Sequence, residues 1–230
     1  MLARRNISEI KPSGLGDQVA RVLAEAILEG EFKGGDQLVE LELQSHFGVS
    51  RSPLREAFRE LEKQGLVVIV PRKGTYVKRI TRKDIEEHFP VRAELEGLAA
   101  RLAAANMNAA ALDDMAGSLE KMRDAVKRGD TKGYYANHLR FHETFIDLAE
   151  NELLYGLLKN LRMQALWHRF SYQYYQEDLE KSYRVHQEIL DLFRASPPDP
   201  EAVGRKVAWH INVALDRFLS YLDEFERKNS

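Results

Sequence analysis

Only one short stretch of this sequence has the pattern of β structure, and that restricts the chain to a mainly helical fold. Residues 66–70 form a β-branched run, residues 71–74 are typical of a turn, and residues 75–77 alternate again. Together they predict a β-hairpin. Elsewhere apolar residues recur at helical spacing. We therefore expect a mainly α protein in which three helices accompany the hairpin and an all-helical bundle follows it.

Glycines and prolines divide the chain into helical segments. Before the hairpin we expect helices over residues 17–29, 38–47 and 50–64, with a left-handed Gly48 ending the second and Gly65 following the third. After the hairpin, Thr81 and Asp84 resemble a capping box. The later helices are expected over residues 82–105, 109–128, 131–149, 152–170, 177–195 and 199–227. The change near residues 78–83 predicts two domains, residues 1–79 and 80–230.

Composition excludes several classes of protein. The chain has no cysteine, which rules out disulfides and thiolate zinc sites and agrees with a cytoplasmic location. It has no apolar run of about 18 residues that would cross a membrane, and its N-terminus lacks the pattern of a signal peptide. Charge is unevenly distributed: residues 51–79 carry eight Lys/Arg against three acids, whereas residues 81–230 carry 21 Lys/Arg against 25 acids. The basic region indicates a module that faces nucleic acid.

Residues 44–65 have the features of a helix-turn-helix. Arg51, Arg55 and Arg59 recur every four residues and line one flank of the second helix. Inward packing is expected for Leu54, Phe58 and Leu61. Arginine is suited to guanine and phosphate contacts, and the basic hairpin tip is suited to a wing. The alternative is that Arg and Glu merely alternate on a solvated helix face, but turn, basic helix and hairpin in this order favour DNA binding.

A family resemblance strengthens this interpretation. The segments Phe47-Gly48-Val49-Ser50-Arg51-Ser52-Pro53-Leu54-Arg55-Glu56-Ala57, Leu61-Glu62-Lys63-Gln64-Gly65-Leu66-Val67 and Arg72-Lys73-Gly74-Thr75-Tyr76-Val77 resemble the GntR family of bacterial transcription regulators. The helical remainder is similar to the FadR-type effector domain, the FCD subclass. The resemblance implies a winged helix-turn-helix with the wing in the minor groove. The residues expected at DNA are Arg51, Ser52, Arg55, Arg59, Lys63, Arg72, Lys73, Gly74 and Thr75.

Four of the seven histidines are candidate metal ligands. His138 and His142 are four residues apart and share a helix face, while His186 and His210 lie in later helices among apolar residues. Neutral imidazoles inside a bundle suit zinc, nickel or a similar cation, although any one of them alone is more simply a buried core histidine. In metal-binding FCD proteins the ligands are an Asp, the His of a Phe-His pair, and two later histidines. The resemblance therefore implies ligation by His142, His186 and His210, and this chain departs from it where His138 replaces the Asp.

Arg92 matches a position that faces the effector pocket in the family. Arginine grips carboxylates in bidentate fashion, so the resemblance implies a small carboxylate effector. The alternative for Arg92 is a surface ion pair with Glu96, four residues on. Tyr134, one turn before His138, is expected to line the same cavity. The cluster of Tyr172, Tyr174 and Tyr175 is compatible with either pocket or core.

The function expected from these features is that of a DNA-binding transcription regulator and not an enzyme. We expect a homodimer on a double-stranded operator, acting as a repressor and controlled by the carboxylate at a zinc or nickel site. The alternative function is a helical-bundle metalloenzyme. It is disfavoured because His142-Glu143 lacks the second histidine of a zincin helix. A purely structural helical adaptor is less favoured still, because nothing in it explains the basic hairpin.

Overall fold

The computed structural model describes residues 14–79, 81–161 and 179–229. The chain divides into two compact units, Met1–Arg79 and Ile80–Ser230. Tyr172, Tyr174 and Tyr175 lie outside the described residues.

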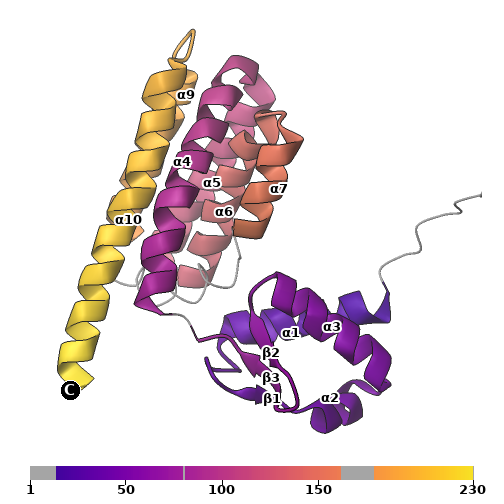
Figure 1. The fold of residues 1–230 in the computed structure, drawn as a ribbon. Helices are drawn as coiled ribbons and strands as arrows, with labels where there is room; N and C mark the ends of the chain where they lie inside the picture. Colours follow the sequence, from indigo (N-terminus) through magenta and orange to yellow (C-terminus); the bar gives the residue numbers. More distant parts are fainter. Residues whose placement is uncertain (1–13, 80, 162–178, 230) are drawn as a thin grey trace, which may run out of the picture. The chain divides into compact units, whose positions relative to one another are not determined.

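The N-terminal unit combines helices α1 (Leu15–Glu29), α2 (Glu40–Phe47) and α3 (Arg51–Lys63) with a small antiparallel sheet (Figure 1). The strands are β1 (Gln37–Leu38), β2 (Val67–Val70) and β3 (Gly74–Val77), in the order β1-β3-β2. As expected, Gly48 ends α2 in a left-handed conformation, with φ 64°. The side of α3 that packs inward contains Leu54, Phe58 and Leu61, all fully buried. The outer flank of α3 is thereby left to its arginines.

The sheet has one strand more than the sequence predicted. Residue 38 was expected to begin a helix, but Leu38 lies in β1, opposite Thr75 of β3, and α2 begins only at Glu40. The expectation that the hairpin is the chain's only β structure is therefore wrong. A two-residue strand has no measurable alternation. Leu38 is held there by burial under the sheet and by its pairing with β3.

Strand β1 also supports the tip of the hairpin. The carbonyl oxygen of Lys73 accepts hydrogen bonds from Nε2 of Gln37 at 3.1 Å and from the hydroxyl of Tyr76 at 3.2 Å. Gly74 adopts φ 123°, and a Cβ there would lie 2.7 Å from Nε2 of Gln37. The glycine is thus required for its backbone conformation, and a larger residue there would also have to displace the amide of Gln37.

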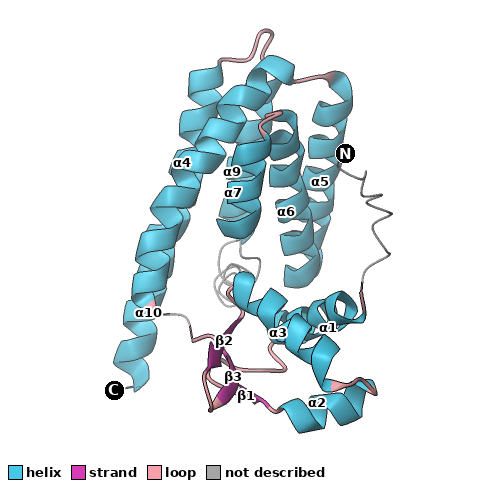
Figure 2. Cartoon of the chain, turned by 45° about the vertical axis from the view of Figure 1, so that its right-hand side comes forward, coloured by secondary structure: helices cyan, strands magenta, loops and turns pink. Residues whose placement is uncertain are grey.

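The C-terminal unit is a bundle of antiparallel helices (Figures 1 and 2). Its described helices are α4 (Arg82–Asn106), α5 (Ala109–Arg128), α6 (Thr131–Leu148), α7 (Glu152–Leu161), α9 (Leu179–Arg194) and α10 (Pro200–Asn229). The predicted capping box is present: Thr81 accepts from the backbone N–H of Asp84, whose carboxylate accepts from Thr81. Helix α4 contacts α10, α6 and α7, while α5 contacts α6 and α9. Helix α4 therefore packs against three of the described helices, and most extensively against α10.

The helices α4 and α10 approach each other closely at two glycines. A Cβ on Gly97 would lie 3.0 Å from the carbonyl oxygen of Gly204, and a Cβ on Gly204 would lie 2.8 Å from the carbonyl oxygen of Gly97. Small residues continue along this side of α4, where Ala93, Ala100 and Ala104 are buried. The glycine pair therefore sets how near the side chains of α10 come to those of α4.

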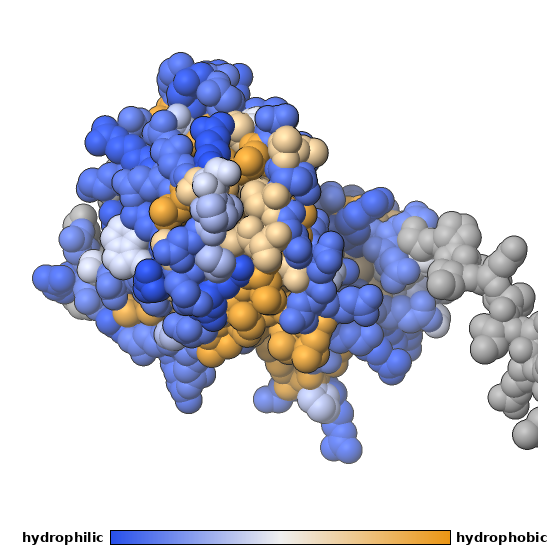
Figure 3. Space-filling view, turned by 90° about the horizontal axis from the view of Figure 1, so that it is seen from above, coloured by the Kyte–Doolittle hydropathy of each residue, from blue (hydrophilic) through white to orange (hydrophobic). Residues whose placement is uncertain are grey.

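Most of the outer surface is hydrophilic, but apolar residues gather on the face seen in Figure 3. Within the described part of the C-terminal unit, the large apolar side chains that are exposed are Val91, Leu153, Tyr155, Leu157 and Trp209. Among the described residues, none of the helices has the length and apolar character needed to span a membrane.

Candidate metal centre and nucleic-acid interface

The arginines of α3 form an exposed basic flank. The side chains of Arg51 and Arg55 are 67% and 58% exposed, and Arg59 is exposed as well. Because the opposite side of α3 is buried in the domain core, the helix presents these three guanidinium groups to any partner. That is the arrangement a recognition helix needs in order to reach base edges in the major groove.

A glutamate that sequence reasoning missed organises two of these arginines. Glu40, the first residue of α2, contacts Nε of Arg51 with Oε2 at 3.3 Å and Nε of Arg55 with Oε1 at 3.2 Å. One carboxylate thus contacts the Nε atoms of both guanidinium groups, one with each of its oxygens. Glu40 therefore restricts the directions in which both arginines can bind.

The remaining residues predicted at DNA differ in their accessibility. Ser52 is exposed and donates to Oε1 of Glu56 at 3.3 Å, and Lys63 pairs with Glu60 at 3.5 Å. At the hairpin tip Arg72 and Lys73 are exposed and Gly74 is half-buried. Thr75 is buried in the sheet beside β1. Its side chain is not on the exposed surface, a consequence of the third strand that the sequence did not reveal.

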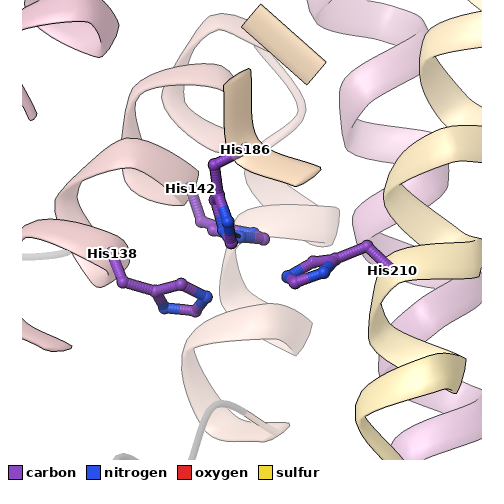
Figure 4. A group of neighbouring side chains, drawn as sticks. All are labelled: His138, His142, His186 and His210. Carbon is purple, nitrogen blue, oxygen red and sulfur yellow. Dashed lines mark hydrogen bonds between the residues drawn. The ribbon is translucent and has the colours of Figure 1, made fainter. Parts of the chain in front are cut away.

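The four predicted histidines converge inside the C-terminal unit (Figure 4). His138 and His142 project from α6, His186 from α9 and His210 from α10. All four are buried, and their candidate ligand nitrogens lie within 4.8 Å of one another. The spacing of four residues places His138 and His142 on one side of α6, whereas the packing of α9 and α10 places His186 and His210 beside them.

Hydrogen bonds fix which nitrogens of two histidines face each other. Nδ1 of His142 lies 2.6 Å from Oε2 of Glu96, and Nδ1 of His186 lies 2.7 Å from the carbonyl oxygen of Ser182. Both partners are acceptors, so both Nδ1 atoms carry a proton. In neutral rings the Nε2 atoms are then both acceptors, yet they lie only 3.0 Å apart. A cation between the two nitrogens removes this repulsion, and either a proton shared by the rings or a metal ion meets that need.

Burial holds the imidazoles of this cluster in the form that binds metals. Desolvation, and next the neighbouring His186, lower the pKa of His138 well below its usual value. Desolvation and His186 do the same to the pKa of His210. The pKa of His186 falls to about 3, because desolvation outweighs its bond to Ser182. A metal competes with protons for these nitrogens, so low pKa values favour the metal.

The cluster fits a metal ion on these observations. A tetrahedral zinc ion with Zn–N bonds of about 2.0–2.1 Å has ligand nitrogens about 3.3 Å apart. The four ligand atoms are already within 4.8 Å of one another, so small side-chain movements bring them onto one ion. Nitrogen donors of this kind suit zinc, nickel and related borderline cations.

A buried carboxylate joins the cluster to Arg92. Oε1 of Glu96 accepts from Nε of Arg92 at 2.6 Å, while Oε2 contacts His142. The side chains of Arg92 and Glu96 are 3% and 0% exposed. The ion pair foreseen from their spacing is therefore present, but it is internal and not on the surface. Sequence reasoning did not connect Glu96 with His142, because the two are 46 residues apart.

Two tyrosines form a wall beside the cluster. The ring of Tyr134 stacks on His138 with centroids 6.4 Å apart, and that of Tyr135 does so at 5.8 Å. Both tyrosines are buried. Tyr134 was expected here from its position one turn before His138, whereas Tyr135 was not. Arg92, Tyr134 and the histidines thus belong to one internal region.

Comparison with known proteins agrees with both units. The family model described as bacterial regulatory proteins, gntR family, matches residues 15–77, and the FCD domain model matches residues 87–213. The chain is 30% identical over 201 residues to a probable D-xylose utilization operon transcriptional repressor of Paenarthrobacter nicotinovorans, covering 87% of each chain. It is 31% identical over 216 residues to the HTH-type transcriptional regulator YdhC of Bacillus subtilis, covering 93% of this chain and 95% of that one.

The structure is also similar to that of E. coli McbR/YncC. The TM-score is 0.77 at 20% identity, with 92% of this chain and all of that chain covered, which supports the shared fold. These relatives are regulators and not enzymes, which disfavours the metalloenzyme alternative. The exposed basic flank of α3, the wing and the histidine-lined bundle are the parts of one known architecture. The chain belongs to the GntR family of bacterial transcription regulators, with an N-terminal GntR DNA-binding domain and a C-terminal FCD domain.

Proposed function

We propose that this regulator is a homodimeric repressor whose operator binding is controlled by a small carboxylate bound at a metal ion among His138, His142, His186 and His210. The observation that carries the proposal is the buried histidine cluster, with two Nε2 atoms facing each other at 3.0 Å. Zinc and nickel are the metals that suit its donors. The relative from Paenarthrobacter is named a repressor, which supports repression, and action on DNA implies the cytoplasm.

Operator recognition is assigned to α3 and the wing. Arg51, Arg55 and Arg59 are exposed on one flank of α3, and we assign them to base edges and phosphates. Ser52 and Lys63 extend this flank, and the exposed Arg72 and Lys73 at the wing reach the backbone or the minor groove. A homodimer presents two such helices to half-sites about one helical turn apart, and exposed apolar residues such as Leu153 and Trp209 supply contact surface for a partner.

Charge balance at the cluster supports an anionic effector. Four neutral imidazoles leave a divalent metal with its full positive charge, and the charge of Glu96 is already balanced by Arg92. A buried centre with net positive charge is costly unless an anion joins it. A carboxylate satisfies this requirement by completing the coordination of the metal, with Arg92 and Tyr134 nearby to orient it.

In this proposal the metal and the histidines have different roles in binding the effector. The metal supplies Lewis-acid affinity for the carboxylate, and the low pKa values of His138, His186 and His210 keep their nitrogens available. The effector changes operator affinity only if it binds one arrangement of the protein better than another. By linkage, an effector that releases DNA must bind more weakly when operator is present.

The test uses purified protein prepared without chelator or nickel-affinity tags. We expect about one zinc or nickel ion per chain by elemental analysis, held by this four-histidine cluster, and a thermal shift with small carboxylates that disappears after metal removal. Arg51→Ala and Arg55→Ala should weaken operator binding by about 1–3 kcal/mol each. The metal site would be rejected if the protein contained no metal and His142→Ala left its stability unchanged. The recognition helix would be rejected if both arginine variants bound the operator as well as the wild type.

A further inference from the structure

Glu96 is an acidic side chain that hydrogen-bonds a histidine of the cluster. It is completely buried, and each of its oxygens has a different partner, Arg92 on one side and His142 on the other. Burying a carboxylate is costly unless it is paired and hydrogen-bonded. The two contacts of 2.6 Å meet that cost and at the same time hold the carboxylate in one orientation.

The contact with Glu96 determines how His142 can act. An acceptor at Nδ1 selects the tautomer in which Nε2 carries the lone pair, and Nε2 is the atom that faces His186. A charged acceptor at Nδ1 also raises the basicity of Nε2, so that its lone pair binds a metal ion more strongly. His186 receives the same orientation from a backbone carbonyl, that of Ser182, which is neutral. The basicity of Nε2 of His142, and with it the strength of its bond to a metal, therefore depends on an acidic side chain.

We infer that Glu96 is a positioning residue of the metal centre, which selects the Nε2-ligating tautomer of His142 and raises the affinity of the histidine cluster for a divalent metal. Arg92 fixes Glu96 by engaging its other oxygen. The inference rests on the metal site of the proposed function and deepens it, because it makes metal affinity depend on a residue that is not a ligand.

Substitution of Glu96 by Gln provides the test. Glutamine has the same shape but no charge, and because its amide both donates and accepts it no longer selects one tautomer of His142. Zinc affinity of the full-length protein is measured by competition with a chromophoric chelator. We expect Glu96→Gln to weaken zinc binding by about 10- to 100-fold, the usual effect of removing such an outer partner of a ligand.

Two control variants separate this effect from general damage. Glu94→Gln removes the same charge from an exposed position of α4, two residues away. Ser182→Ala alters a buried side chain one turn before His186 but keeps the carbonyl that His186 uses. Both should bind zinc within about twofold of the wild type. If Glu96→Gln does not fold, Glu96→Asp replaces it, since the shorter side chain keeps the charge but withdraws it from His142.

Imidazole nitrogen NMR of metal-free protein is the second readout. We expect the wild type to hold His142 in the Nδ1–H tautomer and Glu96→Gln to mix the two tautomers. Equal zinc affinity of Glu96→Gln and wild type, or equal losses in both control variants, overturns the inference. If the wild-type protein binds no zinc, the proposed metal site is overturned. In that case the NMR readout still tests Glu96, because an unchanged His142 tautomer in metal-free Glu96→Gln rejects its role.

Discussion

At the scale of single residues, two acidic side chains determine what neighbouring cationic or basic groups can do. Glu40 contacts two arginines of α3, and Glu96 contacts Arg92 and His142. Their settings differ, because Glu40 is partly exposed whereas Glu96 is fully buried. An exposed ion pair contributes little to stability, so the effect of Glu40 belongs to recognition.

Glu40→Ala is expected to reduce the discrimination of operator from other DNA. Without the carboxylate, Arg51 and Arg55 lose a fixed orientation, and each well-oriented arginine contact is worth about 1–3 kcal/mol of discrimination. Affinity for scrambled DNA should hold or rise, because one negative charge near the phosphates is removed. Fluorescence anisotropy with both DNAs at fixed salt measures the ratio.

Glu42→Ala is the matched control for this change. It removes the same charge from an exposed position of α2, two residues from Glu40. Equal behaviour of the two variants would show that net charge alone is responsible and would contradict an orienting role.

Acid is expected to destabilise the metal-free C-terminal unit. The pKa values of His138 and His210 are well below the usual value in the folded protein and that of His186 is about 3, whereas in the unfolded chain each is about 6.5. Below about pH 6.5 the unfolded chain binds more protons than the folded chain, so stability falls as pH falls toward the folded values and is fully present above about pH 6.5. Urea unfolding of chelator-treated protein between about pH 7.5 and pH 5 measures this. A midpoint that does not change would contradict it.

At the scale of secondary-structure elements, the contact of α4 with α10 controls the geometry of the cluster. Glu96 precedes Gly97 on α4, and Gly204 lies six residues before His210 on α10. The glycine contact therefore fixes the separation of the helices that carry Glu96 and His210. Helix propensity alone would favour alanine at both positions, so the glycines reflect the packing.

Gly204→Ala is expected to lower both stability and metal affinity. The added Cβ would lie 2.8 Å from the carbonyl oxygen of Gly97, and overpacking of this kind costs about 1–3 kcal/mol. The displaced α10 would carry His210 away from the other ligands. Urea unfolding and zinc competition measure the two effects.

Gly117→Ala is the control for this substitution. Gly117 lies within α5 and a Cβ there meets nothing within 4 Å. Replacing an interior helical glycine without a clash should stabilise the protein by up to about 1 kcal/mol. If both alanine variants changed stability in the same direction, the packing explanation for Gly204 would be wrong.

At the scale of the whole molecule, the proposed function couples operator and effector through one free energy. If a carboxylate releases this regulator from its operator, linkage requires operator DNA to weaken carboxylate binding by the same factor, commonly about 5- to 150-fold. Isothermal titration of an active carboxylate, with operator and then with scrambled DNA present, measures the factor. Identical affinities in both titrations would mean that the carboxylate does not control DNA binding.

The sequence predicted the fold class and most helices, because helical periodicity over long segments is a strong signal. It missed β1, since two residues carry no period, and so it did not anticipate the burial of Thr75. Spacing joined His138 to His142, apolar neighbours made His186 and His210 candidates for the same bundle interior, and the family resemblance matched both to ligand positions. The contacts of Glu40 and Glu96 were not predictable, because they depend on how separate helices pack.

The length of α4 has a consequence for signalling within the chain. A 25-residue helix is a rod of about 37 Å, and its first residue, Arg82, follows the DNA-binding unit by three residues. Arg92 and Glu96 lie along the same rod, and Pro90, which cannot donate to the turn before it, interrupts its hydrogen bonding between them and the start. We therefore expect α4 to bend more easily at Pro90 than elsewhere along this rod, because the proline removes one of its backbone hydrogen bonds.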